Sequence, residues 1–178
     1  MVESCCETVF LLIKRPLHGD VSTIQGVLFT GLFNKPLMVE FDQARLSTDG
    51  GAILLKACDE RLRLSTAMAA CLVDGRQAGK INHTLTELFR QRLFGIACGY
   101  PGGNDAARLA NDPVHKLMLD RDPLSGQALA SQPTLSRFEN AAGPKDFLRM
   151  GDTLAKTVIE RHRRHLGRRV KRITLDLA

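Results

Sequence analysis

One carboxylate stands in a segment where it could do chemistry. Asp176 lies within residues 171–178, where alternating apolar and β-branched residues predict a strand. A carboxylate in a buried apolar strand costs free energy unless a partner or a metal ion compensates for it. Carboxylates hold Mg²⁺ in two-metal phosphoryl transfer, so Asp176 is a candidate catalytic and metal-binding residue. The alternative is an edge strand on which Asp176 faces water.

Small polar side chains gather in residues 131–140. Ser131 followed by Pro133 predicts a short capped helix that continues to Asn140, with Leu135 and Phe138 as anchors. This arrangement resembles the recognition helix of a helix-turn-helix, whose first residues reach base edges or phosphates. The candidate DNA-contacting residues are Gln132, Thr134, Ser136, Arg137 and Asn140. The alternative is an ordinary capped helix on the surface.

A cluster of positive charge near the end of the sequence provides a second candidate DNA contact. The net charge of the chain is +6, and without this cluster 18 basic residues would stand against 19 acidic ones. A concentrated basic cluster favours a polyanionic partner such as DNA. The cluster consists of Arg161, Arg163, Arg164, Arg168, Arg169, Lys171 and Arg172. The alternative is a solvated helix end followed by a loop.

Other chemistries find little support. The five cysteines include no Cys-x-x-Cys pair, so a disulfide framework or zinc ribbon is not expected, and Cys58, Cys71 and Cys98 are predicted to fill the core. His162 and His165 could share a helix face, but the arginines around them disfavour a metal ion. No nucleotide-binding or hydrolase motif is present. No run approaches the roughly 20 apolar residues of a membrane span, so we expect a cytoplasmic protein without membrane contact.

The elements that would position these residues are mainly helical. Residues 1–34 show no period and predict an irregular leader, and residues 36–41 predict a short extended segment. Thr84 and Glu87 have the spacing of a capping box and mark the strongest helix. The predicted helices cover residues 52–62, 65–73, 84–98, 104–110, a segment beginning at 113, 131–140 and 145–165.

Three of these helices carry predicted apolar faces. On residues 52–62 the face consists of Ile53, Leu54, Ala57 and Cys58. On residues 84–98 it consists of Leu85, Leu88, Phe89, Leu93, Ile96 and Ala97, with Glu87, Arg90 and Gln91 in water. On residues 145–165 a stripe is formed by Phe147, Met150, Leu154 and Val158. In the helix that begins at residue 113, Val114, Leu117 and Met118 are predicted to face inward.

Five segments in order resemble a known family. They are Phe-Asp at 41–42 with Leu-Ser-Thr-Asp-Gly-Gly-Ala-Ile-Leu-Leu at 46–55, Leu-Phe-Arg-Gln-Arg-Leu-Phe-Gly-Ile-Ala-Cys-Gly-Tyr at 88–100, Asn-Asp at 104–105 with Arg-Leu at 108–109, Asp-Pro at 112–113, and Leu-Ala-Ser-Gln-Pro-Thr-Leu-Ser-Arg-Phe-Glu-Asn at 129–140. Together they resemble the N-terminal region of DDE transposases of insertion sequence family 1380, which carry a group 1 DDE domain. The resemblance covers about residues 36–178.

The resemblance implies separate regions for DNA binding and for catalysis. The helical region of such transposases binds the terminal inverted repeats of the element, and a ribonuclease-H-like domain follows, whose Asp, Asp and Glu bind Mg²⁺. The first carboxylate comes from a strand that matches residues 173–178 here, with Asp176 at one acidic position and Ala178 at the next. We expect no cofactor in this chain alone, because the other acids would lie beyond residue 178.

The expected fold is therefore mainly α: a helical bundle with a helix-turn-helix-like unit that ends in the first strand of a truncated ribonuclease-H-like domain. Residues 1–34 would form the leader, residues 35–168 the DNA-binding region and residues 169–178 the strand. The expected function is recognition of element ends by a catalytically incomplete fragment, which could form a homodimer. The alternatives are a stand-alone helix-turn-helix regulator of transposition and a helical protein that binds other proteins.

Overall fold

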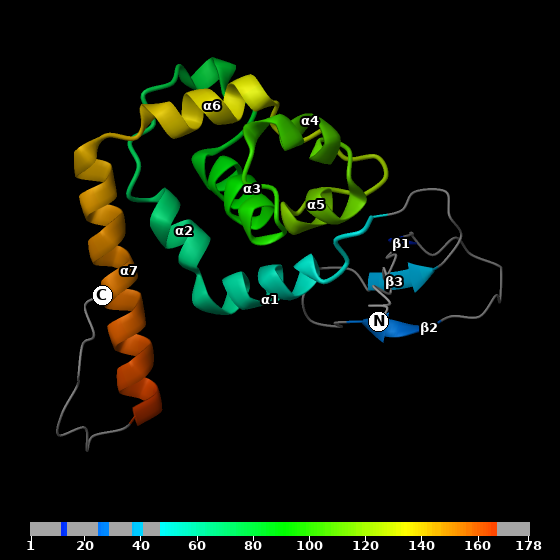
Figure 1. Cartoon of the computed structure of the whole chain (residues 1–178), viewed down its shortest axis with the longest axis horizontal. Helices are drawn as coiled ribbons and strands as arrows, with labels where there is room; N and C mark the ends of the chain where they lie inside the picture. Colours follow the sequence, from blue (N-terminus) through cyan, green and yellow to red (C-terminus); the bar gives the residue numbers. More distant parts are fainter. Residues whose placement is uncertain (1–11, 14–24, 29–36, 41–46, 167–178) are drawn as a thin grey trace, which may run out of the picture.

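Helices dominate the part of the chain that the computed structural model describes, which comprises residues 12–13, 25–28, 37–40 and 47–166. The expectation of a mainly helical chain is confirmed (Figure 1). The α-helices are α1 (Ala52–Leu62), α2 (Leu64–Ala69), α3 (Leu85–Ala97), α4 (Ala106–Leu109), α5 (Pro113–Met118), α6 (Gln132–Ala141) and α7 (Pro144–Leu166). Two 3₁₀ turns are η1 (Ala78–Lys80) and η2 (Gly103–Asp105).

Three short strands form an antiparallel sheet beside the start of α1, on the far side of the molecule from α7 (Figure 1). The central strand β3 (Leu37–Glu40) confirms the extended segment predicted over residues 36–41 and pairs with β1 (Leu12–Ile13) and β2 (Gln25–Leu28). Strands β1 and β2 lie within residues 1–34, where the sequence shows no period, because strand pairing depends on context more than on a periodic sequence signal. The strand predicted over residues 171–178 lies outside the described residues.

Local capping sets the helix starts largely as the sequence predicts. The Thr84 hydroxyl accepts from the backbone N–H of Glu87 at 3.2 Å, and the Glu87 carboxylate accepts from the N–H of Thr84 at 2.7 Å, which confirms the capping box. Asp112 accepts from the N–H groups of Val114 and His115 at the start of α5. Ser131 differs, since its hydroxyl bonds to the Thr134 hydroxyl at 3.1 Å and caps no backbone N–H.

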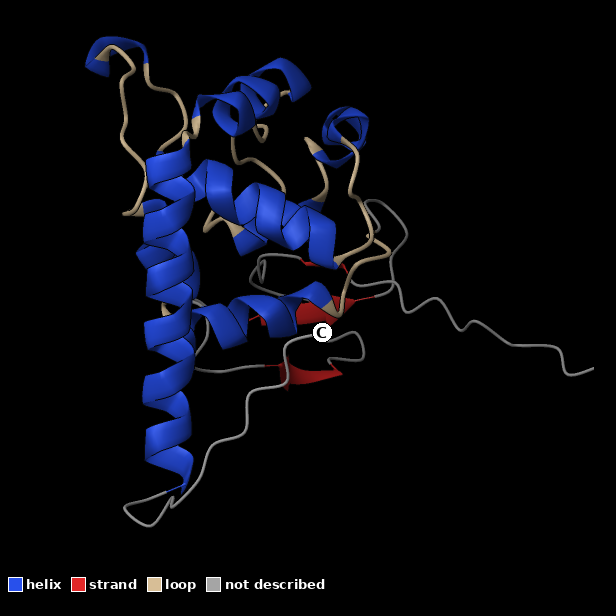
Figure 2. Cartoon of the chain, turned by 60° about the vertical axis from the view of Figure 1, so that its left-hand side comes forward, coloured by secondary structure: helices blue, strands red, loops and turns tan. Residues whose placement is uncertain are grey.

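The core is centred on α5, a six-residue helix with every residue buried. Val114 and Met118 are fully covered and Leu117 nearly so, as predicted, and they pack with Ile53 and Phe94 in the larger of two apolar clusters. The smaller cluster joins α3 and α6 through Leu88, Ala106, Ala130 and Leu135. Figure 2 shows the shorter helices gathered on one side of α7, which stands along one edge of the molecule.

Helix α1 buries Ile53 as predicted, but the rest of its buried face differs from the predicted one. Leu54 is 56% exposed and Cys58 is exposed, whereas Lys56 and Asp59 are buried. Lys56 Nζ donates to the Met118 carbonyl at 3.4 Å and to Asp120 Oδ1 at 2.5 Å. Charged groups can be buried when they gain partners of this kind, so the apolar pattern alone misplaces the face.

Helix α3 also departs from the prediction. Gln91, which the pattern places in water, is 5% exposed, and Ile96, which it places inside, is 50% exposed. The Gln91 side chain bonds to both backbone groups of Ala130, with its amide donating to the carbonyl and its oxygen accepting from the N–H, each at 2.9 Å. The prediction is wrong here because a buried amide with both partners satisfied is tolerated in a core.

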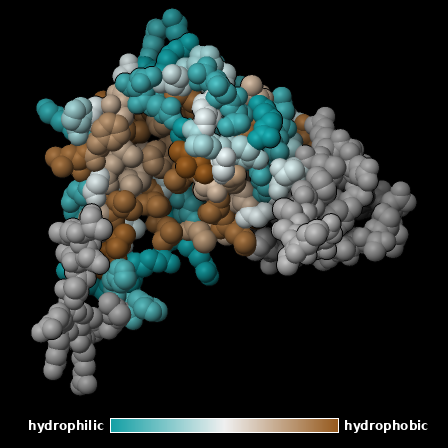
Figure 3. All heavy atoms as spheres, in the orientation of Figure 1, coloured by the Kyte–Doolittle hydropathy of each residue, from teal (hydrophilic) through white to brown (hydrophobic). Residues whose placement is uncertain are grey.

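Helix α7 leaves most of its predicted apolar stripe uncovered. Phe147, Leu154 and Val158 are 57%, 42% and 47% exposed. The face that packs against α2 carries Thr153, whose hydroxyl lies 3.2 Å from the Cys71 sulfur. Apolar side chains lie exposed on the face that Figure 3 shows between α7 and α1.

Asp59 offers a test of the polar link between α1, α2 and α3. Its carboxylate accepts from the Ser65 N–H at 2.8 Å and from the Ser65 hydroxyl at 2.5 Å, and it lies 3.5 Å from Arg90. We expect Asp59→Ala to lower the free energy of unfolding by roughly 2–3 kcal/mol, because Ser65 and Arg90 lose their acceptor. Urea denaturation followed by circular dichroism measures this loss. Glu60→Ala, at the neighbouring and more exposed carboxylate, is the control, and an equal loss in both variants would contradict the prediction.

Candidate nucleic-acid interface

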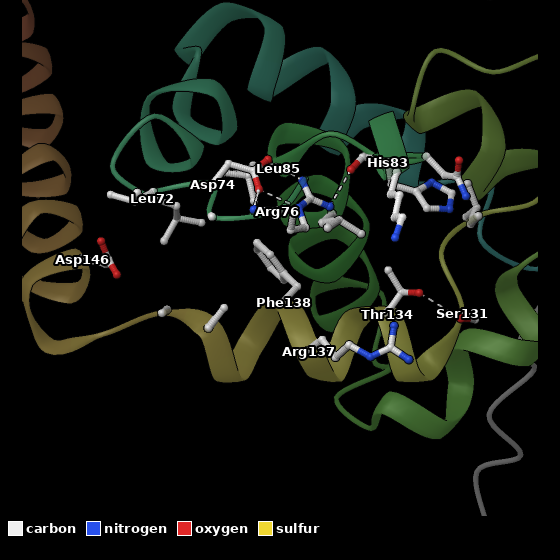
Figure 4. Close-up of a pocket in the computed structure, with 18 of the residues that line it drawn as sticks. Leu72, Asp74, Arg76, His83, Leu85, Ser131, Thr134, Arg137, Phe138 and Asp146 are labelled. Atoms are coloured by element: carbon white, nitrogen blue, oxygen red, sulfur yellow. Dashed lines mark hydrogen bonds and ion pairs between the residues drawn. The ribbon is translucent and has the colours of Figure 1, made fainter. Parts of the chain in front are cut away.

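A cleft of about 680 Å³ separates α6 from the loop that connects α2 to α3. Figure 4 shows Leu72, Asp74, Arg76 and His83 on the loop side and Thr134, Arg137 and Phe138 on α6. The lining includes both apolar residues, namely leucines and Phe138, and charged or hydrogen-bonding residues. The charged and polar members are Asp74, Arg76, Lys80, Asn82, His83, Gln127, Ser131, Thr134, Arg137 and Asp146.

Arg76 fixes the shape of the loop side. Its guanidinium bonds to both carboxylate oxygens of Asp74 at 2.7 Å and donates to the carbonyl of His83 at 2.9 Å (Figure 4). The hydrogen bond from Arg76 holds the pKa of Asp74 below its usual range. A bidentate pair of this kind adds geometric definition to an otherwise exposed loop.

The α6 side is braced from α3. Gln91 holds the backbone at Ala130, just before the helix, and Arg92 forms an ion pair with Glu139 on the helix itself. Leu135 is buried beneath the helix. Three different groups therefore fix the position of α6, which gives its exposed side chains a defined orientation.

A long connection leads into α6. Residues 119–131 separate it from α5, more than the roughly three or four residues of a helix-turn-helix turn. Arg121 organises this connection by donating to the carbonyls of Gln127 and Ala128 and to Glu87 Oε1 at 2.8 Å. Gly126 is required within it, because a Cβ there would lie 2.3 Å from the Asp122 carbonyl oxygen. The connection before α6 is therefore longer than the turn of a helix-turn-helix, and the helix-turn-helix-like unit stays a prediction.

The five candidate residues of α6 divide between two sides of the helix. Thr134 and Arg137 line the cleft. Asn140 instead donates to the Ser136 carbonyl at 2.8 Å, and Gln132 lies against Gly103 of η2. The sequence therefore places all five on one helix, and the fold brings only two of them into the cleft.

Uncompensated positive charge remains at the cleft. Within the described residues, the side chains of Lys80 and Arg137 have no hydrogen-bond or ion-pair partner, and both residues are exposed. The acids in the cleft are already engaged, Asp74 by Arg76 and Asp146 by Arg149 and the N–H of Gly143. The cleft can therefore accept an anionic group without breaking an existing pair.

The basic cluster lies apart from the cleft. Arg161, Arg163 and Arg164 are exposed near the end of α7, with Arg164 3.7 Å from Glu160, and the remaining four basic residues lie outside the described part of the chain. With a rise of about 1.5 Å per residue, Arg161 lies roughly 22 Å along α7 from Asp146 at the cleft. Figure 1 shows α7 running away from α6.

The loop residues Arg76, Lys80 and His83 were not among the predicted site residues. Their signal in the sequence is modest: a polar segment in which Gly75 and Gly79 stand beside basic residues, with no helical or strand period. Only the packing of this loop opposite α6 brings these residues to the cleft.

The other sequence candidate for chemistry, Asp176, lies outside the described residues. Within the residues that are described, no three His, Cys, Asp or Glu side chains come together as a metal site would require. The buried His115, 2.8 Å from Asp49, and the buried Ser47, 3.0 Å from Asp112, are enclosed in the core and join structural elements.

Comparison with known proteins gives one match. A family model described as transposase DDE domain group 1 matches residues 29–178, which is more than half of the chain. No curated protein and no solved structure matches the chain. Among the described helices, none is both long and apolar enough to cross a membrane.

His83 makes the stability of the cleft wall sensitive to pH. Burial and the charge of Arg121, which donates to His83 Nδ1 at 2.9 Å, lower the pKa of His83. The folded state therefore binds fewer protons than the unfolded state near pH 6, so stability is full above about pH 7 and falls as the pH drops below about 6.5.

We expect His83→Asn to flatten the change in the free energy of unfolding between pH 7.5 and pH 5.5, because the variant has no imidazole to protonate. Urea denaturation at several pH values measures the slope. His162→Asn, on the exposed end of α7, is the control and should keep the wild-type slope. An unchanged slope in the His83 variant would show that this histidine is not the responsible group.

Proposed function

Because the chain belongs to the family of transposases with a group 1 DDE domain, we propose that its helical region recognises the ends of a mobile element during transposition. The family suggests a role in transposition and implies contact with DNA. The terminal inverted repeats are the DNA that we propose it binds, and membership of insertion sequence family 1380 is part of the same proposal.

The observation that carries this proposal is the exposed Arg137 on the braced helix α6. Its guanidinium has no partner among the described residues and lies at the edge of a cleft that also holds Lys80. Free positive charge on a rigid element favours binding to a polyanion. A guanidinium can donate two hydrogen bonds to the major-groove edge of guanine, which makes Arg137 the best candidate for reading sequence.

The other polar residues of α6 suit a supporting role. Thr134 lines the cleft with Arg137, whereas Gln132 lies against Gly103 of η2 and Asn140 donates to Ser136 within the helix. Hydroxyl and amide groups at such positions contact phosphates more often than bases and set the register of the protein on the duplex. We therefore assign base reading to Arg137 and positioning to the other residues.

The basic cluster supplies affinity that is independent of sequence. Arg161, Arg163 and Arg164 extend into solvent along α7, away from the cleft. Contacts between such side chains and phosphates release counterions and strengthen binding to any DNA. We propose that α6 selects the site while the cluster, including the residues that follow it to Arg172, holds the neighbouring backbone.

Catalysis enters the proposal only through Asp176. We propose it as the first carboxylate of the DDE set, which would bind Mg²⁺ together with two further acids. No step of strand transfer is assigned to the described residues. The alternative function, a stand-alone regulator of transposition, would use the same DNA-binding residues without any strand cleavage.

Arg137→Ala tests base reading. We expect it to weaken binding to terminal-repeat DNA by about ten- to a hundredfold, because one bidentate contact to guanine is lost, and to change binding to scrambled DNA little. Paired titrations on both duplexes measure this, with circular dichroism as the folding control. Arg61→Ala, at an exposed arginine of α1, is the matched control. Equal losses on both duplexes would reduce Arg137 to a phosphate contact.

The salt dependence of binding tests the basic cluster. If about five of its seven cations meet phosphates, a log–log plot of affinity against salt should have a slope of about −4 to −5. Replacing Arg163, Arg164, Arg168 and Arg169 with Gln should flatten the slope by up to about four units. Lys156→Gln, at a residue paired with Asp152, serves as the control. A slope that the fourfold variant leaves unchanged would mean that the cluster is merely solvated.

A further inference from the structure

The cleft beside α6 combines an apolar surface with a positively charged one. A DNA backbone alone would use only the charged surface. Its apolar part is formed by leucines from three segments of the chain and by the ring of Phe138, which projects from α6 toward Arg76 in Figure 4. The apolar lining includes Leu72, Leu85, Leu88 and Leu129. Its charged part holds Lys80 and Arg137 without partners among the described residues.

We propose that this cleft receives a single unstacked nucleotide, with its base against Phe138 and the leucines and its phosphate at Lys80. The proposal rests on the proposed function, because DNA is the source of nucleotides that a transposase meets. It goes further by assigning a pocket that takes one base out of the duplex.

The size and composition of the cleft suit this ligand. A volume of about 680 Å³ lies within the range of small-molecule sites and leaves room for a base, its sugar and a phosphate. A base presents two apolar faces, which stack on aromatic or apolar side chains regardless of its identity. Half-buried Phe138 and the leucines of the lining offer such a surface.

The remaining polar groups match the edge of a base. Asn82 and Gln127 line the cleft, and their side-chain amides have no partner among the described residues. An amide offers both a donor and an acceptor, as the Watson–Crick edge of a base does. An anionic lipid would satisfy the cations and the leucines, but its acyl chain offers these amides neither a donor nor an acceptor. The amides therefore favour a nucleotide over a lipid.

The experiment compares three probes on the full chain. They are a labelled duplex, the same duplex with one unpaired thymine in a bulge, and thymidine 5′-monophosphate. A duplex that already has an unpaired base spares the energy of unstacking, so we expect the wild type to bind the bulged duplex about tenfold more tightly than the paired one. Binding of the monophosphate would show that the cleft accepts a free nucleotide. Binding of the bulged duplex alone would show that the nucleotide must belong to a strand.

A cleft-filling variant identifies the site. Ala141 is exposed and lines the cleft, so Ala141→Trp should occupy it without removing a charge. The variant should lose the preference for the bulge and bind the paired duplex as the wild type does. Ala155→Trp, at an exposed alanine of α7, is the matched control and should keep the preference. Ala128→Trp fills the cleft from the other wall and serves if Ala141→Trp does not fold.

The outcomes separate the two proposals. Binding to the paired duplex without preference for the bulge, or a preference that survives filling of the cleft, would overturn the nucleotide pocket and leave DNA recognition intact. Binding of thymidine 5′-monophosphate that Ala141→Trp abolishes, together with no binding to either duplex, would support the pocket and overturn DNA recognition. Binding to none of the three probes would overturn both.

Discussion

A single carboxylate oxygen of Asp112 organises the centre of the molecule. It accepts from the Ser47 hydroxyl at 3.0 Å and from the N–H groups of Val114 and His115 at 2.9 and 3.0 Å, so it both starts α5 and ties the segment before α1 to it. His115 then lies 2.8 Å from Asp49. Because this network is largely enclosed, loss of one member would leave the others buried without partners. The whole core around α5 depends on it.

Polar residues of helix α3 connect the core to the helices around it. Arg90 reaches Asp59 and Ser65, Gln91 pairs with Ala130, and Arg92 pairs with Glu139. These consecutive residues point in different directions around the helix, so α3 holds α1, α2 and α6 at once. Glu87 also holds the connection before α6, because it accepts a hydrogen bond from Arg121. Burial alone would raise the pKa of Glu87, but hydrogen bonds from Arg121 and Thr84 keep that pKa below its usual range. The cleft is thus a consequence of how α3 distributes its polar contacts.

The proposed functions belong to two parts of the fold: the cleft with α6, and the end of α7. The cleft and α6 have fixed walls, which suits selective recognition of a base. The end of α7 carries charge into solvent, where flexible arginines can follow a phosphate backbone. The exposed apolar side chains between these two regions, such as Phe147 and Leu154, remain uncovered in the described structure. A transposase family member that binds DNA ends would use both parts together.

The sequence by itself determines the local features. Thr84 with Glu87 and Asp112 with Pro113 mark helix starts because capping is decided within a few residues. Five ordered segments indicate the family, and the family model agrees for its DDE transposase class. Which polar residues of α1 and α3 are buried was decided only by the tertiary structure. Lys56 and Gln91 are buried because their partners Asp120 and Ala130 lie 64 and 39 residues away, and no local period reports such partners. For the same reason Arg76 and Lys80 join Arg137 only in the folded chain, where loop packing forms the cleft.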